Sequence, residues 1–80
     1  MSDDTLERVV RVLAETQKIP AESVTAESTF EQLGIDSLDG INILFAIENE
    51  FGINVPDDAA REIRSVRDLA EGVEKLLAGA

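Results

Sequence analysis

The 80-residue sequence contains no cysteine, histidine, tyrosine or tryptophan. Without cysteine there is no disulfide framework and no thiolate metal site, so a small chain must be held together by helix packing. Without histidine or cysteine the commonest catalytic bases and thiol nucleophiles are missing, which argues against a self-contained hydrolase or transferase. The length predicts a single domain over residues 1–80, and the lack of cysteine fits a cytoplasmic protein.

Positive charge is also scarce, because seven lysines and arginines stand against seventeen acids, for a net charge of −10. Residues 19–60 contain no lysine or arginine but nine acids: Glu22, Glu27, Glu31, Asp36, Asp39, Glu48, Glu50, Asp57 and Asp58. Such a surface repels nucleic acid and anionic membranes and attracts basic patches on other proteins. The alternative is that the acids only keep a small protein in solution.

Long hydrophobic runs are absent, since the longest wholly apolar stretch is Ile43 to Ile47. The first residues, Met1 to Asp4, are acidic where a signal peptide would be basic. The sequence therefore predicts neither secretion nor membrane insertion.

Helical periodicity accounts for most of the remaining chain. Apolar positions with helical spacing predict helices from about Asp4 to Gln17, from Ser37 to Phe51, and from a capping box at Ser65–Asp68 to Gly79. Pro56 predicts the start of a short helix through about Glu62. There is no strand signal, so the predicted fold class is all-α: a small antiparallel bundle of three longer helices and one short helix.

The first connection, Lys18 to Asp36, is long for a compact domain. Five apolar residues along it are spaced so as to pin the loop over a helical core: Ile19, Val24, Phe30, Leu33 and Ile35. We therefore expect an ordered loop that delivers Ser37 to a fixed position.

Ser37 is placed where this loop turns into the most apolar helix. Gly34 permits a sharp reversal, Asp36 suits the N-cap position, and Asp39 can reach back as in a capping box. Ser37 then becomes the first helical residue, with its hydroxyl toward solvent, and a phosphate esterified to it is favoured by the helix N-terminus. The alternative is that Ser37 serves only in capping.

The helix from Ser37 to Phe51 carries two apolar stripes. Ile43, Leu44, Ile47 and Phe51 share an arc of the width expected for a core face. The second stripe is formed by Leu38, Ile41 and Phe45 and lies beside Glu48, Asn42 and Asn49. One helix in so small a domain seldom buries both stripes, so we expect the second to be partly exposed and to dock partner proteins. The alternative is that neighbouring segments cover it.

Gly40 falls inside the same helix, at a cost of roughly 1 kcal/mol relative to alanine. Two explanations stay open: the missing side chain makes space for a bound chain, or another backbone packs closely against it.

The carboxylates suggest no further chemistry. Asp36 and Asp39 are expected in an exposed first turn, where a solvated surface is the better interpretation than an acid/base pair. As a calcium loop, Asp36 to Gly40 fails because its third position is Leu38. We therefore predict no dedicated metal site.

Three segments together resemble an acyl carrier protein of the free-standing bacterial type: Leu33-Gly34-Ile35-Asp36-Ser37-Leu38-Asp39, Phe45-Ala46-Ile47-Glu48-Asn49-Glu50-Phe51-Gly52-Ile53 and Val55-Pro56-Asp57. The resemblance covers most of the chain. It implies that Ser37, flanked by Asp36 and Leu38, carries 4′-phosphopantetheine transferred from coenzyme A by a separate phosphopantetheinyl transferase, and that acyl groups are held on its thiol as thioesters. The carrier itself would be non-catalytic.

The resemblance also implies the surroundings of the arm. Partner enzymes with basic patches, among them ketosynthases and acyltransferases, would dock on Leu38, Asp39, Ile41, Phe45 and Glu48. The acyl chain would be sheltered between the second and third helices by Leu44, Ile47, Ala60 and Ile63. The protein would act as a monomer.

Some residues depart from the family pattern. Asn42 and Asn49 stand where fatty acid carriers often have glutamate, and Phe45 stands where methionine is usual. A polyketide or specialised lipid carrier is therefore as credible as a fatty acid carrier, and a peptidyl carrier ranks third. The rival from a different class is an unmodified acidic helical module that binds proteins through the same stripe.

Overall fold

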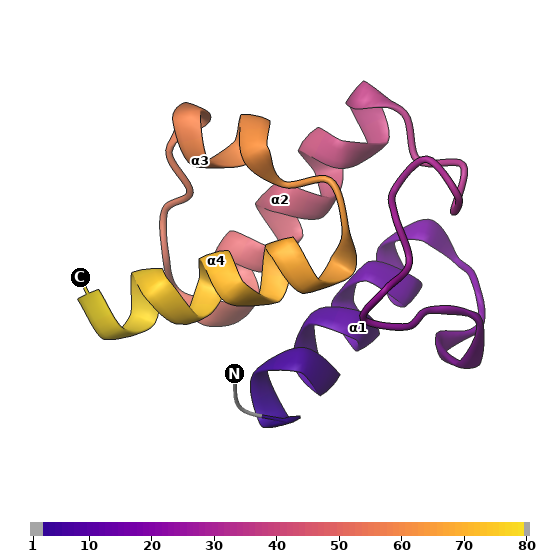
Figure 1. Cartoon of the computed structure of the whole chain (residues 1–80), viewed down its shortest axis with the longest axis horizontal. Coiled ribbons are helices and arrows are strands. Elements are labelled where there is room, and N and C mark those ends of the chain that lie inside the picture. Colours follow the sequence, from indigo (N-terminus) through magenta and orange to yellow (C-terminus); the bar gives the residue numbers. More distant parts are fainter. Residues whose placement is uncertain (1–2, 80) are drawn as a thin grey trace.

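Four α-helices and one 3₁₀ turn make up the regular structure of residues 3–79, the part of the chain that the computed structural model describes. The helices are α1 (Asp3–Gln17), α2 (Ser37–Phe51), α3 (Asp57–Glu62) and α4 (Val66–Gly79), and the 3₁₀ turn is η1 (Ala21–Ser23). Figure 1 shows α4 crossing in front of α2, with α3 above α4 and α1 below it in this view. The predicted all-α bundle of three longer helices and one short helix is confirmed.

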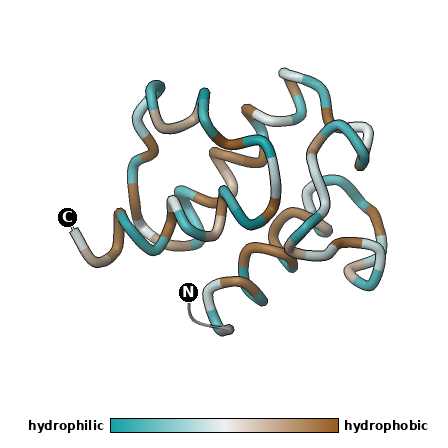
Figure 2. The backbone as a smooth tube through the Cα atoms, in the orientation of Figure 1, coloured by the Kyte–Doolittle hydropathy of each residue, from teal (hydrophilic) through white to brown (hydrophobic). Residues whose placement is uncertain are grey.

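The core lies between α1, α2 and α4, the three longer helices. Its fully buried side chains are Val9, Leu13, Ile43, Ile47, Val66, Leu69 and Val73. Figure 2 shows hydrophobic and hydrophilic stretches alternating along the helices. Burying one such side chain contributes up to about 1.5–3 kcal/mol, so helix packing supplies the stability that disulfides cannot.

The helix ends form largely as the local sequence predicts. Gly52 ends α2 in the left-handed conformation, with φ of 64°, and donates its N–H to the Glu48 carbonyl. At the start of α4 the Asp68 N–H donates to Ser65 Oγ over 3.1 Å. The Asp68 carboxylate reaches back one residue further than a standard box, accepting from the Arg64 N–H.

The long loop before α2 is ordered, as predicted. Val24 is buried, and Phe30, Leu33 and Ile35 pack partly buried against the core. The backbone of the loop is tied to the segment between α3 and α4: the Phe30 N–H donates to the Arg64 carbonyl and the Val66 N–H to the Ser28 carbonyl, each over 3.0 Å. The loop therefore fixes where α2 begins.

The apolar faces of α4 and α1 are not single regular stripes. Leu77 is 47% exposed, because the last turn of α4 extends beyond the core that covers Val73. In α1 the buried face also includes Thr5, Val12 and Ala14. This helix packs against both α2 and α4, so its buried arc is wider than one stripe.

Candidate functional site at the start of α2

The turn before α2 places Ser37 at the first position of the helix. Gly34 has a φ of 72°, in the region that glycine adopts without strain. Asp36 is extended, and its Oδ1 accepts the Asp39 N–H over 2.9 Å, as expected for an N-cap. The reciprocal bond from Asp36 N–H to the Asp39 carboxylate is not formed among the described residues, so only half of the expected capping box exists.

The Ser37 side chain is exposed. Its hydroxyl makes no hydrogen bond to residues 3–79, so the expectation that it faces solvent is confirmed. The Asp36 side chain, and not Ser37, accepts the capping hydrogen bond, which leaves the serine oxygen available for modification. The first turn of α2 also carries unpaired backbone N–H groups and partial positive charge, which favour a phosphate at this position.

A cavity of about 540 Å³ opens beside Ser37. It is lined by Phe30, Ile35, Asp36, Ser37, Gly40, Ile41, Ile43, Leu44, Asp57, Ala60, Arg61, Ile63 and Leu69. Most of these side chains are apolar, so the cavity suits an apolar ligand that starts at the serine.

Three of the four expected pocket residues, Leu44, Ala60 and Ile63, line this cavity. Ile47 does not line it; its fully buried side chain lies in the core instead. The sequence did not assign Phe30, Ile35 or Leu69 to this cavity, because the directions of these apolar side chains depend on how the loop and α4 pack. Arg61 was not assigned to the cavity either. It lies four residues after Asp57 on α3, and this helical spacing, which puts both residues on one face, was the only signal for it.

Gly40 lines the same cavity, and a Cβ atom built on it would meet nothing within 4 Å. No other backbone within residues 3–79 packs against this glycine. Of the two explanations that the sequence left open, the one consistent with this geometry is that its missing side chain leaves room in the cavity.

The second stripe of α2 lies on the surface. Leu38 is 67% exposed, Ile41 48% and Phe45 60%. These three large apolar side chains adjoin Ser37 along one helix, and no segment within residues 3–79 covers them. The predicted exposure is confirmed.

The acids near this stripe are not equally available. Asp39 lies in the first turn of α2, and its carboxylate makes no ion pair within the described residues. The Glu48 carboxylate instead accepts the Val55 N–H over 2.7 Å and holds the segment that follows α2. Both acids are partly buried, but only Glu48 is engaged in this way, so it is less suited to docking than the sequence suggested.

Residues 3–79 contain no cluster of three or more acids that could hold a metal ion. Within the same range, no helix combines the length and apolar character needed to cross a bilayer.

Comparison with known proteins agrees with this site. The family model described as "Phosphopantetheine attachment site" matches residues 7–73, a range that includes the loop, α2 and α3. The chain belongs to the phosphopantetheine attachment family. The resemblance to acyl carrier proteins and the predicted cofactor are thereby confirmed at the level of the family.

The relatives of this chain include two proteins named as organellar. The chain is 43% identical over 75 residues to acyl carrier protein 1, chloroplastic, of Casuarina glauca, and the match covers 92% of this chain and 55% of that protein. It is 41% identical over 69 residues to the mitochondrial acyl carrier protein of Dictyostelium discoideum, covering 86% and 58%. The chain thus spans somewhat more than half the length of these relatives.

A solved structure gives the same result for the fold. The crystal structure of an acyl carrier protein from Thermotoga maritima superposes with a TM-score of 0.79 at 35% identity, covering 90% of this chain and 85% of the other.

Proposed function

We propose that this chain is a non-catalytic acyl carrier for fatty acid or polyketide synthesis, in which Ser37 Oγ is the attachment atom for 4′-phosphopantetheine. The observation that carries the proposal is the exposed Ser37 hydroxyl at the first residue of α2, between an apolar cavity and an exposed apolar stripe. When bound, the group supplies a terminal thiol on a flexible arm, on which acyl groups are held as thioesters.

The residues around Ser37 fit such a group. Asp36 keeps the helix start rigid, so the attachment point is fixed relative to the rest of the domain. The N-terminus of α2 offsets part of the repulsion between a phosphodiester and the carboxylates of Asp36 and Asp39. Tethering at this point keeps the cargo at a high effective concentration for any enzyme that docks nearby.

The cavity beside Ser37 supplies shelter for an apolar cargo. Leu44, Ala60 and Ile63 contribute apolar walls from α2 and from the end of α3, and Gly40 leaves room between them. Burial of a saturated chain there is favoured by roughly 0.8 kcal/mol for each methylene removed from water.

The exposed stripe of Leu38, Ile41 and Phe45, with Asp39 beside it, is the proposed docking surface. An apolar centre with acidic surroundings fits a partner that presents an apolar pocket edged by lysine and arginine. The partners are a phosphopantetheinyl transferase, ketosynthases, acyltransferases and other acyl-handling enzymes. The proposed carrier works as a monomer.

Incubation of the apo protein with coenzyme A and a phosphopantetheinyl transferase tests the assignment. Intact-mass spectrometry should show the addition of one arm, and Ser37→Ala should abolish the addition while circular dichroism shows an unchanged fold. Ser23→Ala removes a different exposed serine, which lies in η1, and this variant should still be modified. If the wild-type mass stays constant, the protein is an unmodified interaction module; if Ser37→Ala is still modified, the site is wrong.

A further inference from the structure

Arg61 interrupts the negative charge around the site. Residues 19–60 contain no lysine or arginine, and Arg61 is the next residue of the chain. It lies in the last turn of α3 and lines the Ser37 cavity, whose other charged lining residues are Asp36 and Asp57. Among the described residues that line this cavity, Arg61 is therefore the only cation.

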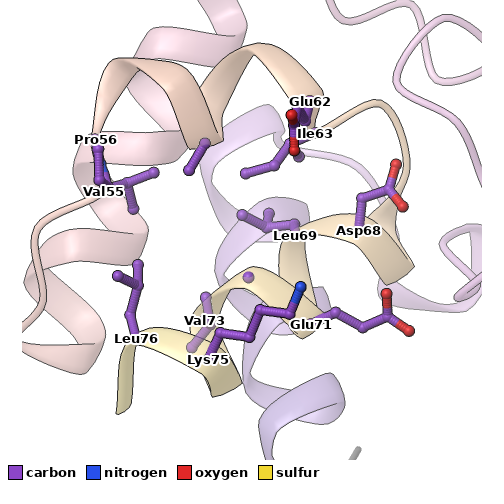
Figure 3. A pocket seen from close by; sticks show the side chains of 12 residues that line it. Val55, Pro56, Glu62, Ile63, Asp68, Leu69, Glu71, Val73, Lys75 and Leu76 are labelled. Carbon is purple, nitrogen blue, oxygen red and sulfur yellow. The ribbon is translucent and has the colours of Figure 1, made fainter. Parts of the chain in front are cut away.

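The Arg61 side chain is exposed and available to a ligand. Three other arginines form ion pairs, whereas the Arg61 guanidinium forms no ion pair or hydrogen bond with residues 3–79. Asp57 lies one turn earlier in α3, but the two side chains do not pair. The next residue, Glu62, borders a different cavity, of about 310 Å³, between α3 and α4 (Figure 3). The guanidinium can therefore bind an anion that the chain itself does not supply.

A phosphate on Ser37 would bring such an anion to the cavity that Arg61 lines. In the proposed carrier the phosphodiester is bonded directly to Ser37 Oγ, so its position is set by the start of α2. Asp36 would repel it, and the N-terminus of α2 offsets only part of that repulsion. Arginine is well suited to offset the rest, because its planar guanidinium can donate two parallel hydrogen bonds to phosphate oxygens.

We propose that the Arg61 guanidinium binds the phosphodiester of the arm on Ser37 and so ties the arm to α3 as well as to α2. The inference rests on the proposed carrier function. A carboxylate on the cargo is a less suitable anion, because it would lie at the far end of a flexible arm, whereas the phosphate is held beside the cavity. The contact would also anchor α3, a helix of six residues that buries none of them.

The test compares the apo and holo forms of the wild-type protein by NMR. Conversion to the holo form should shift the Arg61 Nε–Hε resonance and leave that of Arg64 unchanged. Arg64 is the matched control, because it is also exposed and forms no side-chain ion pair with residues 3–79, but lines neither cavity. The contact is open to solvent, so the Arg61 shift should shrink by roughly half or more between 10 and 300 mM NaCl.

Variants add a second readout, the ³¹P resonance of the holo protein. Arg61→Gln should move this resonance, and Arg61→Lys should move it less because the charge is kept. Arg64→Gln makes the same charge change outside both cavities and should leave the resonance in place. All three variants should still gain the mass of one arm, since Ser37 and its neighbouring cap are unchanged.

The inference is overturned if the Arg61 resonance is the same in the apo and holo forms, or if the ³¹P resonance of Arg61→Gln matches that of the wild type. Arg61 would then be only a solubilising surface charge. It is also overturned if the Arg61 resonance moves only after a cargo with a terminal carboxylate is loaded, because the cargo would then be the anion. In these cases Ser37 would still accept its arm and the carrier function would stand, whereas an unchanged mass of the wild-type protein would remove both.

Discussion

At the scale of single residues, Asp36 and Ser37 have different roles at the site: Asp36 caps α2, and Ser37 presents a free hydroxyl. Either residue type can cap a helix, but the structure gives the cap to Asp36, whose Oδ1 binds the Asp39 N–H. Ser37 is therefore released to carry a substituent without loss of the helix start. A chain in which the serine itself capped α2 would have to break that bond on modification.

Replacing Asp36 tests whether its side chain caps α2. Asp36→Ala should lower the free energy of unfolding by about 1 kcal/mol in urea denaturation, because one N–H of the first turn loses its acceptor. Asp36→Asn keeps a capping oxygen and should lose much less. Equal losses in both variants would show that charge at the helix N-terminus, rather than capping geometry, holds the start of α2.

Local signals explain which of these residues could be predicted. The N-cap needs only its own few neighbours in sequence, so Asp36 and the exposure of Ser37 were predictable. Glu48 was not, because its carboxylate binds the Val55 N–H, seven residues on and beyond the end of its helix. The donor, the Val55 N–H, comes within reach only when the turn after α2 is in place.

At the scale of the elements, α2 has one face in the core and another in solvent. Ile43 and Ile47 are almost completely buried, whereas Leu38 and Phe45 are more exposed than covered. Periodicity predicted both faces because they are set by the helix alone. Ile47 is buried in the core as periodicity predicted, and only its assignment to the acyl pocket, which the resemblance implied, differs from the structure. Which residues of α2 face the cavity, and how far α4 extends beyond the core at Leu77, depend on packing between helices.

Truncating a side chain on the exposed face of α2 should impair docking, whereas truncating one on the core face should lower stability. Phe45→Ala should change the free energy of unfolding by no more than about 0.5 kcal/mol, as is usual for surface substitutions, yet raise the KM of the transferase for this protein. Ile47→Ala should cost roughly 2–5 kcal/mol, because it leaves a cavity in the core. Urea denaturation and steady-state kinetics measure the two effects. A large stability loss in Phe45→Ala with unchanged KM would mean that Phe45 belongs to the core.

At the scale of the whole molecule, charge is compensated unevenly. Arg8 and Arg11 of α1 pair with Glu50 over 3.1 and 3.3 Å, and Arg67 pairs with Glu27 over 2.8 Å. Arg8 also stacks over the Phe51 ring, 4.3 Å from its centroid, so this contact joins the end of α2 to α1. The other seven acids of residues 19–60 have no such partner within residues 3–79, and two of them, Asp36 and Asp57, line the Ser37 cavity.

This imbalance predicts that salt acts in opposite directions on folding and on docking. Screening weakens repulsion among the unpaired carboxylates, so the Tm of the isolated protein should rise by several degrees between 10 and 300 mM NaCl, roughly one kcal/mol of stability. The same screening weakens attraction to a basic partner, so the KM of the transferase for this protein should rise several-fold over that range while kcat stays constant. Tetramethylammonium chloride should reproduce both trends, because screening needs no specific cation site. If only sodium raised the Tm, a bound ion would be responsible; if the KM fell with salt, the apolar stripe rather than the acids would direct the encounter.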